Sequence, residues 1–124
     1  MTIEQVKKNS SYLFYCKEFY FAGIKPTDFI SDKNNGYKVL IEIAQLYFEK
    51  NLLEEFATYL MEGQYFVQLW TAHLILEFGT PDETLKKLCL DEIEKYSDNP
   101  LAPDVAIQEE KWLKEYYGKA NNNK

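Results

Sequence analysis

Residues 68–79 read QLWTAHLILEFG, and this stretch decides the fold because apolar side chains cover nearly every side of one helical segment. It contains the only histidine of the chain, His73. At about 100° per residue, Trp70, His73 and Glu77 share one narrow edge of the helix, and Gln68 lies apart from them. The pattern predicts a helix that other helices surround on most sides, with one polar edge left to solvent.

Five more helices are predicted around this one, because its flanks carry recognisable start and stop signals. Downstream, Thr80 can cap a helix whose first turn holds Pro81 and Asp82. At the N-terminus, Thr2 and Gln5 have the spacing of a capping box. The expected helices span about residues 2–21, 34–50, 52–63, 65–78, 80–96 and 103–118, the last closed by Gly118.

No segment shows the two-residue alternation of a half-buried strand, so the predicted class is all-α, with about six helices in three antiparallel pairs. Sliding the chain by 38 positions places Leu74 on Trp112 and Glu77 on Glu115, so the fourth and sixth helices are alike. The third and fifth helices match at an offset of 32. Such a period predicts a HEAT-like α-solenoid.

We expect one domain over residues 1–118 and a disordered tail at 119–124. Residues 67–88, VQLWTAHLILEFGTPDETLKKL, resemble short HEAT-like bacterial domains with a Val-Arg-x-Trp-Ala-Ala helix, then a Pro-Glu-led helix and an Ala-x-x-x-Leu-x-x-Trp helix. The likeness covers about residues 35–118 and departs at Gln68, where these repeats place Arg. Similar domains occur as immunity proteins encoded beside contact-dependent or polymorphic toxins. The resemblance therefore implies binding rather than chemistry.

The formal charge of −6 is unevenly distributed along the chain. Residues 1–50 carry seven Lys and six acidic side chains, whereas residues 51–124 carry seven Lys and fourteen acidic side chains. There is no Arg, the residue that reads guanine edges and grips phosphate, so nucleic acid is not the expected ligand. An acidic surface favours a basic protein partner, although solubility alone is the commoner reason for such a charge.

Three predicted helices each carry a polar stripe with a spacing of three and then four residues. The candidate partner-binding residues are Glu42, Gln45 and Glu49; Trp70, His73 and Glu77; and Gln108, Lys111 and Glu115. In a stack of helix pairs these second helices line one wall, so the stripes should lie side by side. The row of carboxylates would suit a Lys- or Arg-rich partner, with Trp70 as an anchor.

Structural explanations compete with this hypothesis, because a helix packed on three sides must carry polar residues on its fourth. His73 and Glu77 have the i,i+4 spacing of an exposed pair, which favours a structural role for His73 over catalysis. Glu109 and Glu110 could lie at the rim of a contact, but solvation is the more common use of adjacent acidic residues.

The segment 12–21, YLFYCKEFYF, is dense in aromatic residues that cannot all face one core. They could cap the end of the solenoid, pack under the loop at 22–35, or form a contact with a second copy or a partner. We favour the cap, since terminal repeats must cover an apolar face.

Several classes of site have no signature here. The N-terminus lacks a signal-peptide core and no apolar stretch has the length of a membrane span, so we expect a cytoplasmic protein without membrane contact. Cys16 and Cys89 lack metal-ligand spacing and are expected to be reduced core thiols. One histidine and five glycines provide neither a zinc site nor a phosphate loop, so no metal and no cofactor are predicted.

The resulting hypothesis is a non-catalytic protein-binding domain. Its first form is an immunity protein that blocks a cognate toxin, possibly a basic nuclease, by covering the substrate cleft with an acidic surface. The alternative is a scaffold or adaptor subunit of a cytoplasmic complex. An enzyme of unrecognised type is the third class, for which His73 would be the first residue to test.

Overall fold

The computed structural model describes residues 1–26, 37–99 and 101–122, and all regular elements in these ranges are helical, which confirms the all-α prediction. The elements are α1 (Ile3–Lys8), α2 (Ser11–Ala22), α4 (Lys38–Glu49), α5 (Leu53–Ala57), the 3-10 helix η2 (Thr58–Met61), α6 (Val67–Phe78), α7 (Glu83–Ser97) and α8 (Pro103–Asn122). The start of the predicted helix at 34–50 lies partly outside the described residues.

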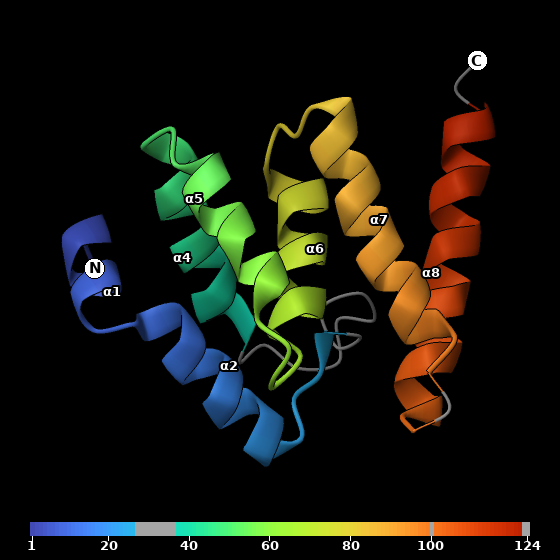
Figure 1. Cartoon of the computed structure of the whole chain (residues 1–124), viewed down its shortest axis with the longest axis horizontal. Helices are drawn as coiled ribbons and strands as arrows, with labels where there is room; N and C mark the ends of the chain where they lie inside the picture. The colour runs from blue at the N-terminus through green and yellow to red at the C-terminus, as the bar shows by residue number, and fades with distance from the viewer. Residues whose placement is uncertain (27–36, 100, 123–124) are drawn as a thin grey trace.

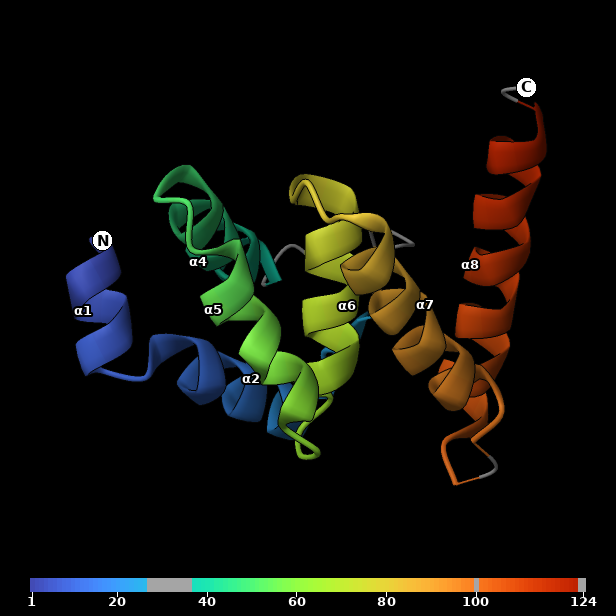
Figure 2. The ribbon, with the colours of Figure 1, turned by 45° about the horizontal axis from the view of Figure 1, so that its top comes forward.

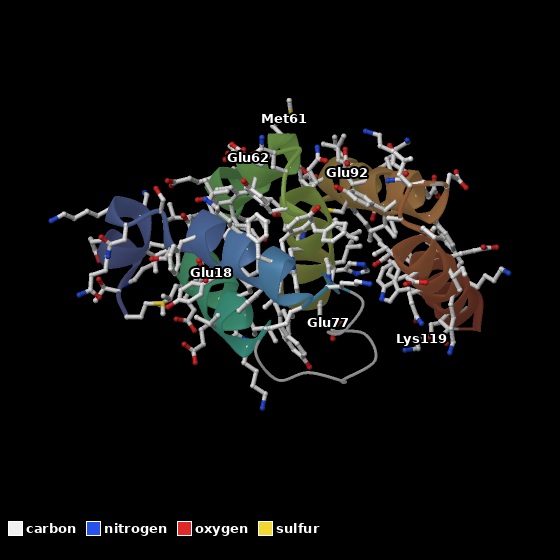
Figure 3. All side chains as sticks on the ribbon, turned by 90° about the horizontal axis from the view of Figure 1, so that it is seen from below. Glu18, Met61, Glu62, Glu77, Glu92 and Lys119 are labelled. Atoms are coloured by element: carbon white, nitrogen blue, oxygen red, sulfur yellow. The ribbon has the colours of Figure 1, made fainter. Side chains whose placement is uncertain are left out.

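Two layers of helices make up most of the molecule. Helices α4, α6 and α8 run in one direction, and α5 with η2 and α7 run back between them (Figure 1). Seen from below, the first group lies along one side and the second along the other, with α2 crossing in front of them (Figure 3). Figure 2 shows the same order from α1 at one end to α8 at the other. This order fits the predicted alternation of helices, while a HEAT-like solenoid remains a prediction.

Helix α6 is the centre of the core. It packs against α2, α4, α5, η2 and α7. All side chains from Leu69 to Ile75 are buried, as the near-continuous apolar circumference of this segment predicts. Burying one Leu or Ile side chain contributes about 1.5–3 kcal/mol. The segment at 68–79 therefore supplies the largest single share of the hydrophobic stabilisation.

The predicted first helix, 2–21, is interrupted at Asn9 and Ser10. The capping box of Thr2 and Gln5 forms as expected. Asn9 then ends α1, and Ser10 adopts a left-handed conformation with φ of 50° before α2 begins. Asn and Ser are weak in helix interiors because their side chains compete for backbone groups. The break lets α1 pack on α4 while α2 crosses both α4 and α6.

Three other predicted helix ends differ from the structure. The helix expected at 52–63 divides into α5 and η2. Helix α7 is capped by Asp82, whose side chain accepts a hydrogen bond from the backbone N–H of Leu85 at 2.8 Å, rather than by Thr80. Helix α8 continues to Asn122, so Gly118 does not end it, while the disordered tail at 119–124 stays a prediction. An interior Gly weakens a helix by about 1 kcal/mol, which does not suffice to stop it.

Candidate functional site

The predicted polar stripes lie at the surface on two of the three helices. On α4, Glu42, Gln45 and Glu49 are exposed. On α8, Lys111 and Glu115 are exposed and Gln108 is half-buried. On α6 only Glu77 reaches solvent, and Figure 3 shows it on the side of the molecule that carries α4, α6 and α8. None of the carboxylates of these stripes forms an ion pair with another described residue.

The prediction that Trp70 and His73 lie on an exposed edge is wrong. Each is only 1% exposed. Helix α2 crosses α6 and brings Phe19 to 6.4 Å from Trp70, measured between ring centroids, and Tyr37 packs on the same indole at 6.4 Å. The aromatic segment 12–21 therefore covers the centre of the predicted wall. The stripe residues that stay at the surface are those of α4 and α8, with Glu77 from α6.

His73 forms a buried hydrogen bond with Glu109 rather than a surface pair with Glu77. Its Nε2 atom lies 2.7 and 3.0 Å from the two carboxylate oxygens of Glu109, and both side chains are 0% exposed. The His73 ring also meets Trp112 edge to face at 4.6 Å. The expectation that Glu109 solvates the surface is therefore wrong as well.

A signal for this pair is present in the sequence. Glu109 follows Val105 by four residues and precedes Leu113 by four, and all three are buried. This i, i+4, i+8 pattern marks the core face of α8. The predicted stripe of Gln108, Lys111 and Glu115 lies beside that face rather than on it. The period of α8 therefore placed Glu109 inside, although its charge suggested the surface.

The chemistry open to the His73 and Glu109 pair is limited by its burial. A carboxylate bonded to an imidazole can orient the ring or move a proton, but only toward a group that can reach it. With no exposed surface on either side chain, a dissolved substrate has no access to this pair. Its visible role is to join α6 to α8, which packs mainly on α7. Removing one partner of such a pair is strongly destabilising.

A second region places aromatic side chains in solvent. At the end of α2, Tyr20 and Phe21 are 46% and 70% exposed, and Phe14 on the same helix is 54% exposed. Tyr65 and Phe66, in the connection between η2 and α6, are half-buried. We name the set Phe14, Tyr20, Phe21, Tyr65 and Phe66 the aromatic face.

Ring contacts join most of this face into one surface. The ring of Tyr20 lies 5.4 to 5.5 Å from those of Phe21, Tyr65 and Phe66, measured between centroids. Phe21 also approaches Tyr65 at 5.8 Å. Edge-to-face and tilted contacts at these distances are favourable for aromatic pairs. The rings are therefore held by each other as well as by the helices that carry them.

The turn within the aromatic face is strained. Tyr65 and Phe66 are consecutive residues in the left-handed region, with φ of 55° and 58°. For residues with a Cβ this conformation is unfavourable by about 1–2 kcal/mol each, so Gly or Asn is usual there. The backbone N–H of Val67 donates to the carbonyl of Gln64 at 3.0 Å and closes the turn. Bulky aromatic residues kept in strained backbone are typical of functional sites.

Two cavities lie beside this turn. The larger, of about 490 Å³, is lined by Tyr20, Gly63, Gln64, Tyr65, Phe66, Tyr96, Asn99 and Ala102. The smaller, of about 260 Å³, is lined by Asn9, Ser10, Leu13, Phe14, Lys17, Glu62, Gln64, Tyr65 and Val67. Gln64 and Tyr65 line both, so the strained turn divides them. A third cavity, of about 480 Å³, lies beside Phe48 and Thr80.

The electrostatics of the larger cavity are set by nearby acidic residues. Burial, and then the carboxylate of Glu92, raise the pKa of Tyr96 above its ordinary value. Glu62 adjoins Gly63 in the wall, and Asp98 adjoins Asn99. Figure 3 shows Glu62, Met61 and Glu92 along the edge opposite Glu77. The cavity and the predicted acidic wall are therefore separate regions.

Burial keeps two thiols and one phenol of the interior neutral. Burial raises the pKa values of the Tyr12 hydroxyl and the Cys16 thiol, and raises that of Cys89 to about 12. The hydroxyls of Tyr12 and Thr71 are 2.9 Å apart, and the Thr71 hydroxyl donates to the carbonyl of Val67. Both cysteines are buried and free, which confirms the prediction of core thiols.

Two further kinds of site are absent from the described residues. Within residues 1–26, 37–99 and 101–122, no group of three or more His, Cys, Asp or Glu side chains is arranged to hold a metal ion. None of the helices that the structure describes has both the length and the apolar character of a membrane span.

The sequence indicated the aromatic face only in part. The density of aromatic residues in α2 predicted that some of them reach a surface, and Phe14, Tyr20 and Phe21 do. Nothing in the local pattern placed Tyr65 and Phe66 beside them, because that contact joins α2 to a turn more than forty residues later. The likeness of residues 35–118 to HEAT-like immunity domains stays a prediction. In comparisons with protein-family models, curated proteins and solved structures, no significant match to the chain was found.

Proposed function

We propose that this chain is a non-catalytic protein-binding domain whose contact surface is the aromatic face. One observation carries the proposal: large apolar side chains that are well exposed, Phe21 at 70% and Phe14 at 54%, lie on the same helix beside a strained aromatic turn. Contiguous apolar surface of this kind marks interaction sites more often than isolated exposed residues do. Tyr and Phe are also enriched at the centres of protein interfaces.

The aromatic face could cap the core or contact a partner, and these two explanations predict different positions for the rings. Residues that serve only to cap the core would turn their rings inward, as Phe19 does where it packs on Trp70. The ring of Phe21 instead meets those of Tyr20 and Tyr65, which both belong to the aromatic face. Its exposed area would be buried on contact with a partner, and each square ångström of apolar area buried contributes roughly 25 cal/mol before the losses of association.

The charge of the chain supports a basic partner. The net charge is −6, and exposed carboxylates lie on α4, α6 and α8. Complementary charge would speed association and exclude acidic proteins. Together with the resemblance described above, this favours an immunity protein that neutralises a basic toxin domain by direct binding. A scaffold subunit would use the same face without a toxin.

Site-specific cross-linking in the native cell tests the contact surface. A photo-reactive phenylalanine at position 21 is compared with the same group at position 107, because Phe21 and Ile107 have similar exposures of 70% and 65% but lie on α2 and α8. We expect a cross-link to a basic protein from position 21 and none from position 107. Equal labelling at both positions, or cross-links only to a second copy of this chain, would contradict the proposal.

A charge-reversal variant separates the aromatic face from the acidic residues first predicted as the site. The substitutions Glu49→Lys, Glu77→Lys and Glu115→Lys alter three exposed carboxylates and leave α2 unchanged. If the aromatic face is the contact, cross-linking from position 21 should persist, with slower association because steering is weakened. Complete loss of the cross-link would return the site to the helices α4, α6 and α8.

A further inference from the structure

The larger cavity beside the strained turn has aromatic walls from three parts of the chain. Tyr20 comes from α2, Tyr65 and Phe66 from the turn, and Tyr96 from the last turns of α7. Phe66 links the two sides, with its ring 5.4 Å from Tyr20 and 6.0 Å from Tyr96. Four rings thus surround about 490 Å³, a volume that can hold one large side chain.

Two carboxylates are next in sequence to residues that line this cavity. Glu62 and Asp98 adjoin residues of its wall and are exposed, and neither forms an ion pair with another described residue. Glu92 is near enough to Tyr96 to disfavour the ionised phenol, although Lys95 pairs with Glu92 at 2.9 Å. Among the residues that the structure describes, no Lys lines the larger cavity. An anion would therefore meet no positive side chain from these residues, whereas a cation would meet ring faces in the wall and carboxylates next to it.

One ring of the wall already attracts a cation within the chain. The Nζ atom of Lys17 lies over Tyr65 at 6.0 Å from the ring centroid. Lys17 lines the smaller cavity and not the larger one, so it leaves the larger cavity open. Positive groups within about 6 Å of an aromatic centroid are stabilised by the ring quadrupole, by roughly 0.5–2 kcal/mol.

We infer that this cavity receives a cationic side chain, Arg or Lys, from the bound protein partner and so anchors the complex. The inference rests on the proposed function and names the chemistry of its central contact. Ring faces would hold the cation, Glu62 and Asp98 would favour its entry, and the side-chain oxygen of Gln64 in the wall can accept a hydrogen bond from it. The strained turn serves this site because it aims two consecutive rings at the same space.

Titration with single-residue probes tests the cavity without the partner. N-acetyl-arginine amide and N-acetyl-lysine amide are compared with N-acetyl-norleucine amide, which has a similar length and no charge, by NMR of the full chain. We expect saturable shifts of the Tyr20, Tyr65 and Tyr96 ring signals with the two cations, with dissociation constants on the order of 10 mM. The norleucine amide should bind at least about ten-fold more weakly.

Variants show whether the probes bind where the geometry places them. Tyr65→Leu and the surface pair Glu62→Gln with Asp98→Asn should each weaken cation binding several-fold. The control is Tyr117→Leu, which changes an exposed ring of α8 outside both the aromatic face and this cavity and should leave cation binding unchanged. Equal binding of the norleucine amide, absence of saturation with both cations, or equal loss in Tyr117→Leu would overturn the inference. These outcomes leave the cross-linking result at position 21 untouched, so the inference and the proposed function fail separately.

Discussion

The contact between α6 and α8 and the aromatic face of α2 depart from the usual distribution of side chains in opposite directions. In the first, a histidine and a glutamate are 0% exposed. In the second, phenylalanines reach 54% and 70% exposure. Burying charge and exposing aromatic rings are both unfavourable unless something compensates. The two regions differ in whether contacts within the chain compensate for this unfavourable free energy.

For the buried pair, the compensation lies within the chain. Glu109 offers two oxygens to one imidazole nitrogen, and Trp112 packs against the ring. For the aromatic face, the contacts within the chain leave more than half of the Phe21 side chain in water. The folded chain alone therefore accounts for the first region, whereas in the second the proposed partner would bury the exposed rings. This contrast is the physical basis for placing function at the aromatic face.

The largest expected effect is loss of the buried carboxylate. Glu109→Ala removes the partner of His73 and leaves a cavity between α6 and α8. We expect the free energy of unfolding to fall by about 3–5 kcal/mol, because the buried imidazole of His73 loses the carboxylate that contacts its Nε2 atom. Urea denaturation followed by circular dichroism measures this change.

The neighbouring residue provides the matched control. Glu110 is exposed and pairs with Lys114 at 3.3 Å on the surface, so Glu110→Ala should change the free energy of unfolding by less than about 0.5 kcal/mol. Replacing both partners, His73→Leu with Glu109→Leu, should recover most of the loss, since no unpaired polar group remains. A double variant as unstable as Glu109→Ala would show that the pair is not the source of the effect.

The same contrast explains what the sequence could predict. Helix content, the central position of residues 68–79 and the two buried cysteines followed from periodicity, because a long apolar segment can be satisfied only in the interior. The burial of Trp70 and His73 could not be predicted from periodicity. A helical wheel places them on an edge of α6, but whether another helix covers that edge depends on how α2 crosses it. Local pattern contains no information on that crossing.

For the candidate site, prediction from the sequence is limited by the distance along the chain between residues that are in contact. Glu109 could be assigned to the core face of α8 from its spacing to Val105 and Leu113, but its partner lies 36 residues away. Tyr65 and Phe66 could not be assigned at all, because their left-handed backbone is unusual for aromatic residues and no local signal predicts it. The residues that tertiary contacts decide were therefore the ones misplaced or missed.

The second expected effect is a loss of folding stability at alkaline pH, which tests the burial of the thiols. Folding raises the pKa values of Cys16 and Tyr12, and raises that of Cys89 to about 12. The unfolded chain releases these thiol protons near pH 8.5, while the folded chain keeps them, so stability is full below that pH and falls above it. We expect a loss of about 2 kcal/mol between pH 8 and 9.5, measured from urea midpoints.

A cysteine-free chain checks the origin of this pH dependence. With Cys16→Ala and Cys89→Ala the protein should be less stable at pH 7, because small cavities form, but its stability should hardly change up to pH 9.5. Tyrosines would add a decline only closer to pH 10. An unchanged slope in the cysteine-free chain would assign the alkaline loss to other groups.

The third effect tests whether the backbone at Tyr65, in the turn of the aromatic face, is strained. Tyr65→Gly and Tyr65→Ala remove the same ring contacts and differ only in a Cβ at a φ of 55°. The Gly variant should be more stable by about 1 kcal/mol, the reverse of the usual order. At the exposed helical position Lys87, Ala should instead exceed Gly by about 1 kcal/mol. The same order at both positions would mean that residue 65 is not strained.

The smallest effect on stability is expected where the functional effect is largest. Phe21→Ser removes a ring whose contacts are to Tyr20 and Tyr65 at 5.4 and 5.8 Å, and most of that ring is already in water. The free energy of unfolding should change by no more than about 0.5 kcal/mol, whereas capture of the partner should be lost. Phe19→Ser, on the same helix but packed on Trp70, should lower it by about 2–3 kcal/mol. If Phe21→Ser were as destabilising as Phe19→Ser, the exposed rings would belong to the internal packing, and the need for an external partner at this face would disappear.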